Sequence, residues 1–265
     1  MRLELVPRAR FSTIVGLAAC AAVGAVLSAQ STLPVRSDAN VPFTVGETLT
    51  YDVTWSSTLV TGSAVTTVLE RTPSLGSNAY RIVAEGKPLP LVERLYHLYY
   101  RMETMLDSVT LLPHLSSVYS EEGASKRTAT TTFERAARIA SFGIQSEPTV
   151  HVEVPVPQQA QDGLSALYIL RTMALRAGES FTLPITDDGR VYSMKAAVSG
   201  QERIAVPFGQ VDAWSVDLTI TNEQGLPAAE DAAVWISNDE RRLPIRLQAN
   251  LPVGNFVLLL RDVNE

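Results

Sequence analysis

The sequence predicts a mainly β fold: a curled antiparallel sheet, half-barrel or barrel-like, with one main helix packed on it. Three observations support this prediction. Short segments in which apolar and polar residues alternate recur between residues 49 and 260. Residues typical of turns separate these segments, and one stretch carries a clear helical stripe. A period of two is that of a strand with one face buried.

The first thirty residues, 1–30, are predicted to be a signal peptide. Three arginines stand among the first ten residues, residues 14–27 are an apolar run, and small residues precede a cleavage point near Gln30. The run is shorter than the roughly 20 residues that a membrane helix needs. We therefore expect an exported, periplasmic protein.

Cys20, the one cysteine of the chain, gives an alternative. Leu17-Ala18-Ala19-Cys20 fits a lipoprotein signal, which would leave the protein lipid-anchored through Cys20. Residues 21–27 nevertheless stay apolar, whereas a lipoprotein usually becomes polar after its cysteine. Ordinary cleavage would leave no cysteine and hence no disulfide.

Composition and charge narrow the function classes. The chain has 46% hydrophobic and 19% charged residues, a balance typical of globular proteins. Its net charge is −6, and loss of the leader, with three arginines and one glutamate, would bring it to −8. Nucleic acid is therefore excluded as the main partner, because phosphate binding needs clustered Lys and Arg.

After the leader we expect a flexible lead-in over residues 31–42 and a single β-rich domain over 43–265. The first strand is the clearest, since Leu49, Tyr51, Val53 and Trp55 alternate with polar residues. Further strands are predicted at residues 63–69, 79–84, 100–106, 128–133, 138–142, 149–154, 181–185, 191–197, 204–207, 211–221, 233–237, 243–249 and 255–260.

Two stretches break the β pattern. Residues 89–98 suit a short helix entered through Pro90. The stronger helix begins with Asp162 as its cap and ends at Gly178, and its apolar stripe contains Leu164, Leu167, Tyr168 and Leu175.

Arg171 lies on that stripe, seven residues after Leu164. Burying a guanidinium is costly unless a carboxylate and hydrogen bonds satisfy it. Three interpretations stay open: a structural ion pair that holds the helix on the sheet, a contact with an anionic ligand in a pocket, and a side chain that extends outward to solvent.

The sequence predicts no enzyme activity. Ser165 lacks the second glycine of a nucleophile elbow and falls within the predicted helix. His97, His114 and His151 have no triad-like context, so we interpret all three as structural or exposed.

No metal and no cofactor are predicted either. Histidine or cysteine pairs at ligand spacing are absent from the sequence, and Asp187-Asp188-Gly189 is interpreted as a β-turn rather than a calcium loop. Glu103 and Asp107 lie near the end of one predicted strand, but acidic residues in such places are usually solvated.

Ligand binding is favoured by recurring aromatic residues. A curved sheet that carries them on its inner face either fills its core or encloses an apolar cavity. We name Arg171, Tyr168 and Trp55 as the candidate ligand-binding residues.

The motifs together resemble the domain-of-unknown-function 3108 family. The resemblance rests on the opening FTVGETLTYDVTW at residues 43–55, followed by Gly62, and on Asp107 before Leu111-Leu112-Pro113. It continues with DGLSALYILR at residues 162–171, and with WISND at 235–239 before RLPIRL at 242–247. It covers residues 43–260 and implies an exported bacterial protein with no established activity. The expected fold is a curled antiparallel sheet, similar in outline to the half-barrels that carry lipoproteins or lipids across the periplasm.

Two functions are compatible with these observations. In the first, the protein binds an apolar or lipid-like ligand in the concave face of the sheet, and the helix from Asp162 plugs or floors the cavity. In the second, it is a structural or partner-binding module of the envelope with a filled core.

Overall fold

Fourteen strands form one antiparallel sheet in the computed structural model, which describes residues 40–56, 59–145, 150–251 and 254–265. All of these belong to one compact unit. The predicted signal peptide and residues 31–39 of the lead-in lie outside the described residues. Within the described part, no helix has the length and apolarity needed to cross a membrane.

Strands that follow one another in the chain are paired, except β8 and β9, which form the two edges of the sheet. The first strand, β1, pairs with the last, β14. The first eight strands are β1 (Thr48–Trp55), β2 (Val60–Ser74), β3 (Ser77–Pro88), β4 (Leu98–Asp107), β5 (Pro113–Glu122), β6 (Ser125–Glu134), β7 (Ile139–Ile144) and β8 (Val150–Pro155). The remaining six are β9 (Ser180–Asp187), β10 (Arg190–Val206), β11 (Gly209–Asn222), β12 (Glu230–Ser237), β13 (Pro244–Leu251) and β14 (Gly254–Asn264). The predicted mainly β fold with one main helix is confirmed.

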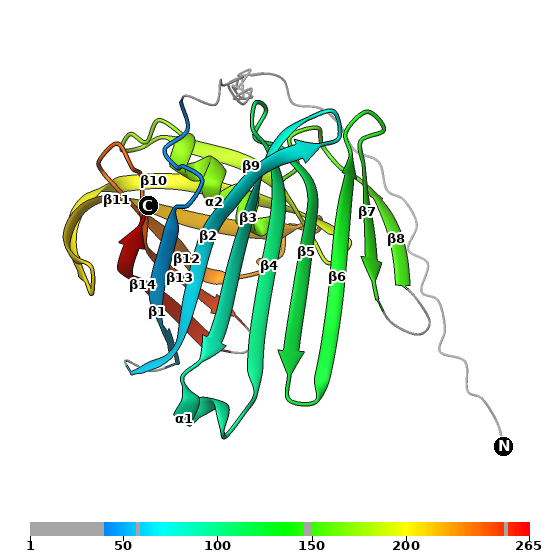
Figure 1. The fold of residues 1–265 in the computed structure, drawn as a ribbon. Helices are drawn as coiled ribbons and strands as arrows, with labels where there is room; N and C mark the ends of the chain where they lie inside the picture. The colour runs from blue at the N-terminus through cyan, green and yellow to red at the C-terminus, as the bar shows by residue number, and fades with distance from the viewer. Residues whose placement is uncertain (1–39, 57–58, 146–149, 252–253) are drawn as a thin grey trace, which may run out of the picture. The chain divides into compact units, whose positions relative to one another are not determined.

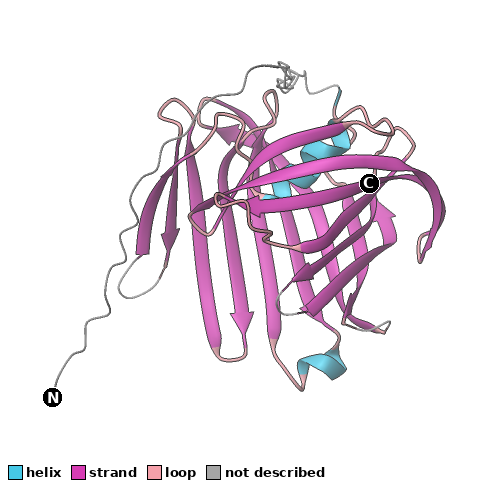
Figure 2. Cartoon of the chain, turned by 180° about the vertical axis from the view of Figure 1, so that it is seen from behind, coloured by secondary structure: helices cyan, strands magenta, loops and turns pink. Residues whose placement is uncertain are grey.

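The sheet curls so that β10–β13 cross behind β1–β7 (Figure 1; Figure 2 shows the reverse side). Gln161, in the link between β8 and β9, partly bridges the open edge. Its backbone N–H donates to the carbonyl of Pro184, and its carbonyl accepts from the N–H of Thr186. The sheet is therefore barrel-like, with a seam between its first and last edges.

The main helix, α2 (Gly163–Thr172), lies against the concave face. Asp162 caps it as predicted, because its carboxylate accepts from the N–H groups of Leu164 and Ser165, both at 2.9 Å. The second carboxylate oxygen accepts from the Thr104 hydroxyl of β4 at 2.7 Å. The cap thus fixes both the start of the helix and its position on the sheet.

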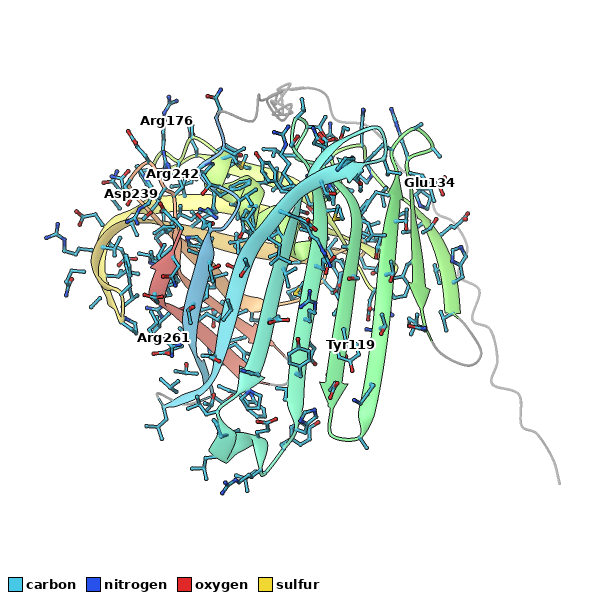
Figure 3. The ribbon with its side chains drawn as sticks, viewed as in Figure 1. Tyr119, Glu134, Arg176, Asp239, Arg242 and Arg261 are labelled. Carbon is cyan, nitrogen blue, oxygen red and sulfur yellow. The ribbon has the colours of Figure 1, made fainter. Side chains whose placement is uncertain are left out.

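The two faces of the sheet differ in chemistry over strands β3–β5. Ile82 of β3 and Leu106 of β4 point inward and join the core beneath α2. On the convex face, Arg81 binds both oxygens of Glu103 across the same two strands. Tyr119 of β5 lies on that face as well (Figure 3). This division is what period-two alternation predicts for a sheet with one buried face.

The structure differs from the predicted elements at several places. β5 was not predicted, because its concave positions include Ser116 and Ser120 and its alternation is therefore weak. The predicted strands 191–197 and 204–207 form one strand, β10, which has a bulge between Val198 and Gly200. The short helix α1 is Pro90–Glu93 only, not 89–98.

The main helix also ends earlier than Gly178. Met173 leaves the helical conformation with ψ 147°, and the buried Leu175 joins the core from the non-helical segment that follows. Residues 40–42 of the predicted lead-in belong to the fold, since Val41 packs on the core and the Pro42 carbonyl accepts from Arg171 at 2.9 Å.

Candidate ligand cavity

A cavity of about 590 Å³ lies in the concave face at the end of the sheet where α1 is found. Its wall comes from β1–β5, β14 and α1. The apolar side chains that line it are Val53, Trp55, Ala64, Pro88, Val92, Tyr96, Leu98, Tyr100, Phe256 and Leu258.

The cavity lies on the same concave face of the sheet that core side chains fill beneath α2. In β3, Ile82 belongs to the core, Ala84 borders it, and Gly86 lines the cavity. In β4, Leu106 is in the core and Leu98 is in the cavity. One half of the concave face is therefore covered by the helix and the other half is hollow.

Small residues help to keep this half hollow. Gly86 lies directly across from Ala64 of β2. A Cβ atom at Gly86 would meet nothing within 4 Å. Sequence reasoning missed these positions; the signal is the fall in side-chain size along the inward row of β3, from Ile82 through Ala84 to Gly86.

Trp55 forms one wall of the cavity, as its ring stacks on Phe256 at 6.0 Å between centroids and 6° between planes. Gly254 makes this position available. Its φ is 132°, and a Cβ there would overlap the Trp55 indole and the Ser56 hydroxyl. Only glycine suits both the conformation and the space.

Polar groups are few in the cavity. The Tyr100 hydroxyl donates to the Glu122 carboxylate. Burial, followed by this hydrogen bond, raises the pKa of Tyr100 to about 12. Its hydroxyl therefore stays protonated at neutral pH. Lys87 also borders the hollow, but alternation along β3 places its side chain on the face opposite to that of Gly86.

Arg171 and Tyr168 lie elsewhere, so of the three residues named from the sequence only Trp55 reaches the cavity. Arg171 forms a structural ion pair with Glu47, with Nη–Oε distances of 2.6 and 2.7 Å. Tyr168 is 1% exposed and packs edge-on against Phe43. The helix that carries them fills the other half of the concave face and does not floor the cavity.

The electrostatics of Arg171 fit this role. Burial opposes its charge, but the hydrogen bonds and attraction of Glu47 leave the pKa of Arg171 above its ordinary value. Its remaining donors bind the carbonyls of Pro42, Arg241 and Arg242. Asp239 and Arg242 mark this end of the sheet in Figure 3.

Comparison with known proteins extends these observations. The family model for proteins of unknown function, DUF3108, matches residues 50–261. The chain belongs to the DUF3108 family. The matched span contains every residue that lines the cavity. No curated protein matches this DUF3108 chain.

Several solved structures match the DUF3108 chain. A β-barrel-like protein of the domain of unknown function DUF1849 from Brucella abortus superposes with a TM-score of 0.53 at 11% identity, over 83% of this chain and 97% of its own. A candidate exported protein with a YmcC-like fold from Bacteroides fragilis has a TM-score of 0.34 at 12% identity, over 85% and 98% of the two chains. A candidate lipoprotein from Parabacteroides distasonis has a TM-score of 0.34 at 10% identity, over 85% of this chain and 99% of its own.

One polar cluster of the DUF3108 chain was not visible in the sequence. His114 lies between Ser74, whose Oγ is 2.9 Å from Nδ1, and Asp107, whose Oδ2 is 3.4 Å from Nε2. No local motif joins these residues. The Asp107 carboxylate also accepts from Ser77 and from the backbone N–H groups of Val109 and Thr110. The cluster therefore fastens the β2–β3 turn to β4 and β5.

No group of three or more potential metal ligands occurs among the residues that the structure describes. Asp188 and Gly189 form the predicted β-turn between β9 and β10, both with positive φ. Glu103 is engaged by Arg81, and Asp107 by its own turn, so neither faces the cavity. A second hollow of about 520 Å³ near β8 and β10 is lined largely by polar residues, including Arg190, Asn222 and Glu223.

His114 gives a pH prediction. Burial lowers the pKa of His114, with a smaller contribution from Arg135, and Asp107 only partly opposes this. Its pKa in the folded chain thus lies below the unfolded value of 6.5, so this contribution to stability is present above pH 6.5 and lost as the pH falls. We expect the free energy of unfolding to decrease from pH 7.5 to pH 5.

Urea denaturation of the wild type and of His114→Gln across this range checks the prediction. The variant should show a shallower loss of stability on acidification. His97 and His151 are present in both proteins and cancel in the comparison. Equal pH slopes for the two proteins would show that His114 is not the group responsible.

Proposed function

We propose that the protein is a non-enzymatic, exported protein of the bacterial envelope that holds an apolar or lipid-like ligand in the hollow half of its concave face. The observation that carries this proposal is the cavity of about 590 Å³ next to Trp55. Ligand sites in proteins are usually clefts of about 300–1,000 Å³ with mostly apolar walls and few polar groups.

The distribution of polar groups favours an amphiphile. Trp55, Phe256 and Leu258 offer an apolar wall suited to a hydrocarbon chain, while Glu122 and the Tyr100 hydroxyl supply polar groups in the lining. A ligand with one apolar chain and a hydrogen-bonding head would satisfy both parts.

The alternative is a structural or partner-binding envelope module with a filled core. The half of the concave face beneath α2 agrees with it, but the hollow half does not, since an empty apolar cavity lowers stability without benefit. Export is proposed from the pattern of residues 1–30, with a periplasmic location and, as the alternative, a lipid anchor at Cys20.

Quenching of tryptophan fluorescence tests ligand binding. A fatty acid brominated along its chain should quench part of the fluorescence of the protein, because a bound chain would lie against Trp55. We expect Trp55→Phe to abolish this quenching. Trp214→Phe is the matched control, since the Trp214 indole donates to Asn238 and lies outside the cavity lining, and it should leave the quenching intact.

Protein purified gently from its own host provides the second measurement. Native mass spectrometry should show a bound lipid or fatty acid that organic extraction removes. Protein that carries no ligand and shows no quenching that depends on Trp55 would refute the proposal and favour the structural module.

A further inference from the structure

The mouth of the cavity carries an apolar rim that is exposed to solvent. Leu59, Leu91 and Leu95 protrude most, with exposed fractions of 74%, 73% and 85%. Trp55, Tyr96 and Tyr100 are exposed over 39%, 48% and 38% of their surface and also line the cavity. We call these six residues the apolar rim.

Contacts within the chain hold the rim together at one end of the sheet. The N–H of Leu89, just before α1, donates to the Thr61 carbonyl of β2 at 2.8 Å. The loop after α1 is fixed by the N–H of Gly123, which donates to the His97 carbonyl at 2.9 Å. α1 lies at the end opposite α2 in both views of the fold (Figures 1 and 2).

We propose that the apolar rim docks on the surface of a lipid bilayer, with Leu91 and Leu95 inserted among the lipids. This inference rests on the proposed function. Because Trp55, Tyr96 and Tyr100 belong both to the rim and to the lining, the apolar surface of the rim continues into the cavity. A hydrocarbon chain could pass from a bilayer into the cavity without crossing water, whereas a protein partner seated there would close the mouth.

The chemistry of the rim suits a bilayer interface. Trp and Tyr are enriched where membrane meets water, because their rings are apolar and their polar tips bind water and headgroups. Charged residues of both signs adjoin the rim, among them Lys87 and Arg94 on one side and Glu93 and Glu122 on the other. No strong field of either sign would therefore oppose contact, and attachment would depend mainly on buried apolar area.

A fluorophore sensitive to polarity locates the contact. It would be attached at position 91 in Leu91→Cys, and separately at position 75 in Leu75→Cys, both in a Cys20→Ser background. That background removes the only other thiol of the chain and the candidate lipid-attachment residue. Leu75 is a matched control, being 75% exposed in the β2–β3 turn, away from the cavity.

With vesicles of phosphatidylethanolamine and phosphatidylglycerol, we expect the emission of the label at position 91 to shift to the blue and rise at least about twofold. The label at position 75 should not respond. In flotation with the same vesicles, Leu91→Ser/Leu95→Ser should lower the partition coefficient at least about tenfold, because burial of even one leucine side chain contributes roughly this factor. Leu75→Ser/Leu226→Ser, which changes two leucines that are 75% and 60% exposed, should leave it unchanged.

Equal responses at the two label positions, or equal flotation of the two double variants, would overturn the docking proposal. So would a label at position 91 that responds only to a co-purifying protein. Quenching by monomeric brominated fatty acid is measured without vesicles, so loss of docking with intact quenching, or the reverse, shows which of the two proposals has failed.

Discussion

Replacing Arg171 with methionine is expected to lower the free energy of unfolding by about 3–5 kcal/mol, because the variant leaves Glu47 charged and buried without a partner. The side chains of Arg171 and Glu47 are 0% and 4% exposed. The guanidinium binds both carboxylate oxygens and also joins α2 to the start of the fold, through the Pro42 carbonyl, and to the segment before β13. Chemical denaturation measures the loss.

Two further proteins sharpen this test. Arg176→Met is the control, because it removes an exposed arginine that pairs with Glu179 at the protein surface. It should change the free energy of unfolding by no more than about 0.5 kcal/mol. Glu47→Leu/Arg171→Met removes both charges of the pair and should recover part of the loss, although three carbonyls lose their donor. An Arg171→Met protein as stable as Arg176→Met would mean that Glu47 finds water or another partner.

This ion pair illustrates what sequence patterns can and cannot supply. The helical stripe indicates that Arg171 faces the protein, and burial then requires a carboxylate. The pattern does not identify that carboxylate, because Glu47 is 124 residues away in the chain. The contact depends on how β1 and α2 meet in space, which no local period encodes. The ion pair was accordingly one of three open interpretations of Arg171.

The cavity shows a second limit of what sequence patterns can predict. Alternation in β1 predicts that Tyr51, Val53 and Trp55 share a face, and Trp55 does lie on the inner wall. Period two does not reveal what covers that face. Tyr51 is 1% exposed and packs with Trp235 and Leu243 in a second cluster of buried residues, whereas Trp55, four residues further along the strand, borders the hollow. α2 is only ten residues long and contributes no residue to the lining of the cavity, so the hollow next to Trp55 stays uncovered.

Strand β5 was missed for a related reason. Its inward positions include Ser116 and Ser120, so its sequence lacks the apolar row that marks β3 and β4. Its place in the sheet comes from backbone pairing with β4 and β6 on both sides, as in Val118 opposite Met102 and Ala129. A central strand can therefore be specified by its neighbours although its own pattern is weak.

Filling the cavity from Gly86 is expected to reduce ligand affinity at least about tenfold, equivalent to 1.4 kcal/mol, with no loss of stability. In Gly86→Phe the new ring would point into the hollow, because a Cβ at this position meets no atom within 4 Å. Glycine within a strand costs conformational entropy, so the substitution should if anything stabilise the sheet by about 0.5–1 kcal/mol. Titration of a fatty-acid series, together with denaturation, measures both effects.

Gly200→Phe is the matched control. Gly200 is also a strand glycine with open space around its Cβ position, but it lies at the β10 bulge, outside the cavity lining. It should bind ligand like the wild type. Because the ring in Gly86→Phe shortens the hollow rather than removing it, the residual binding should favour shorter chains than the wild type prefers. An unchanged chain-length preference with unchanged affinity would mean that hydrocarbon does not occupy this cavity, whatever else the protein binds.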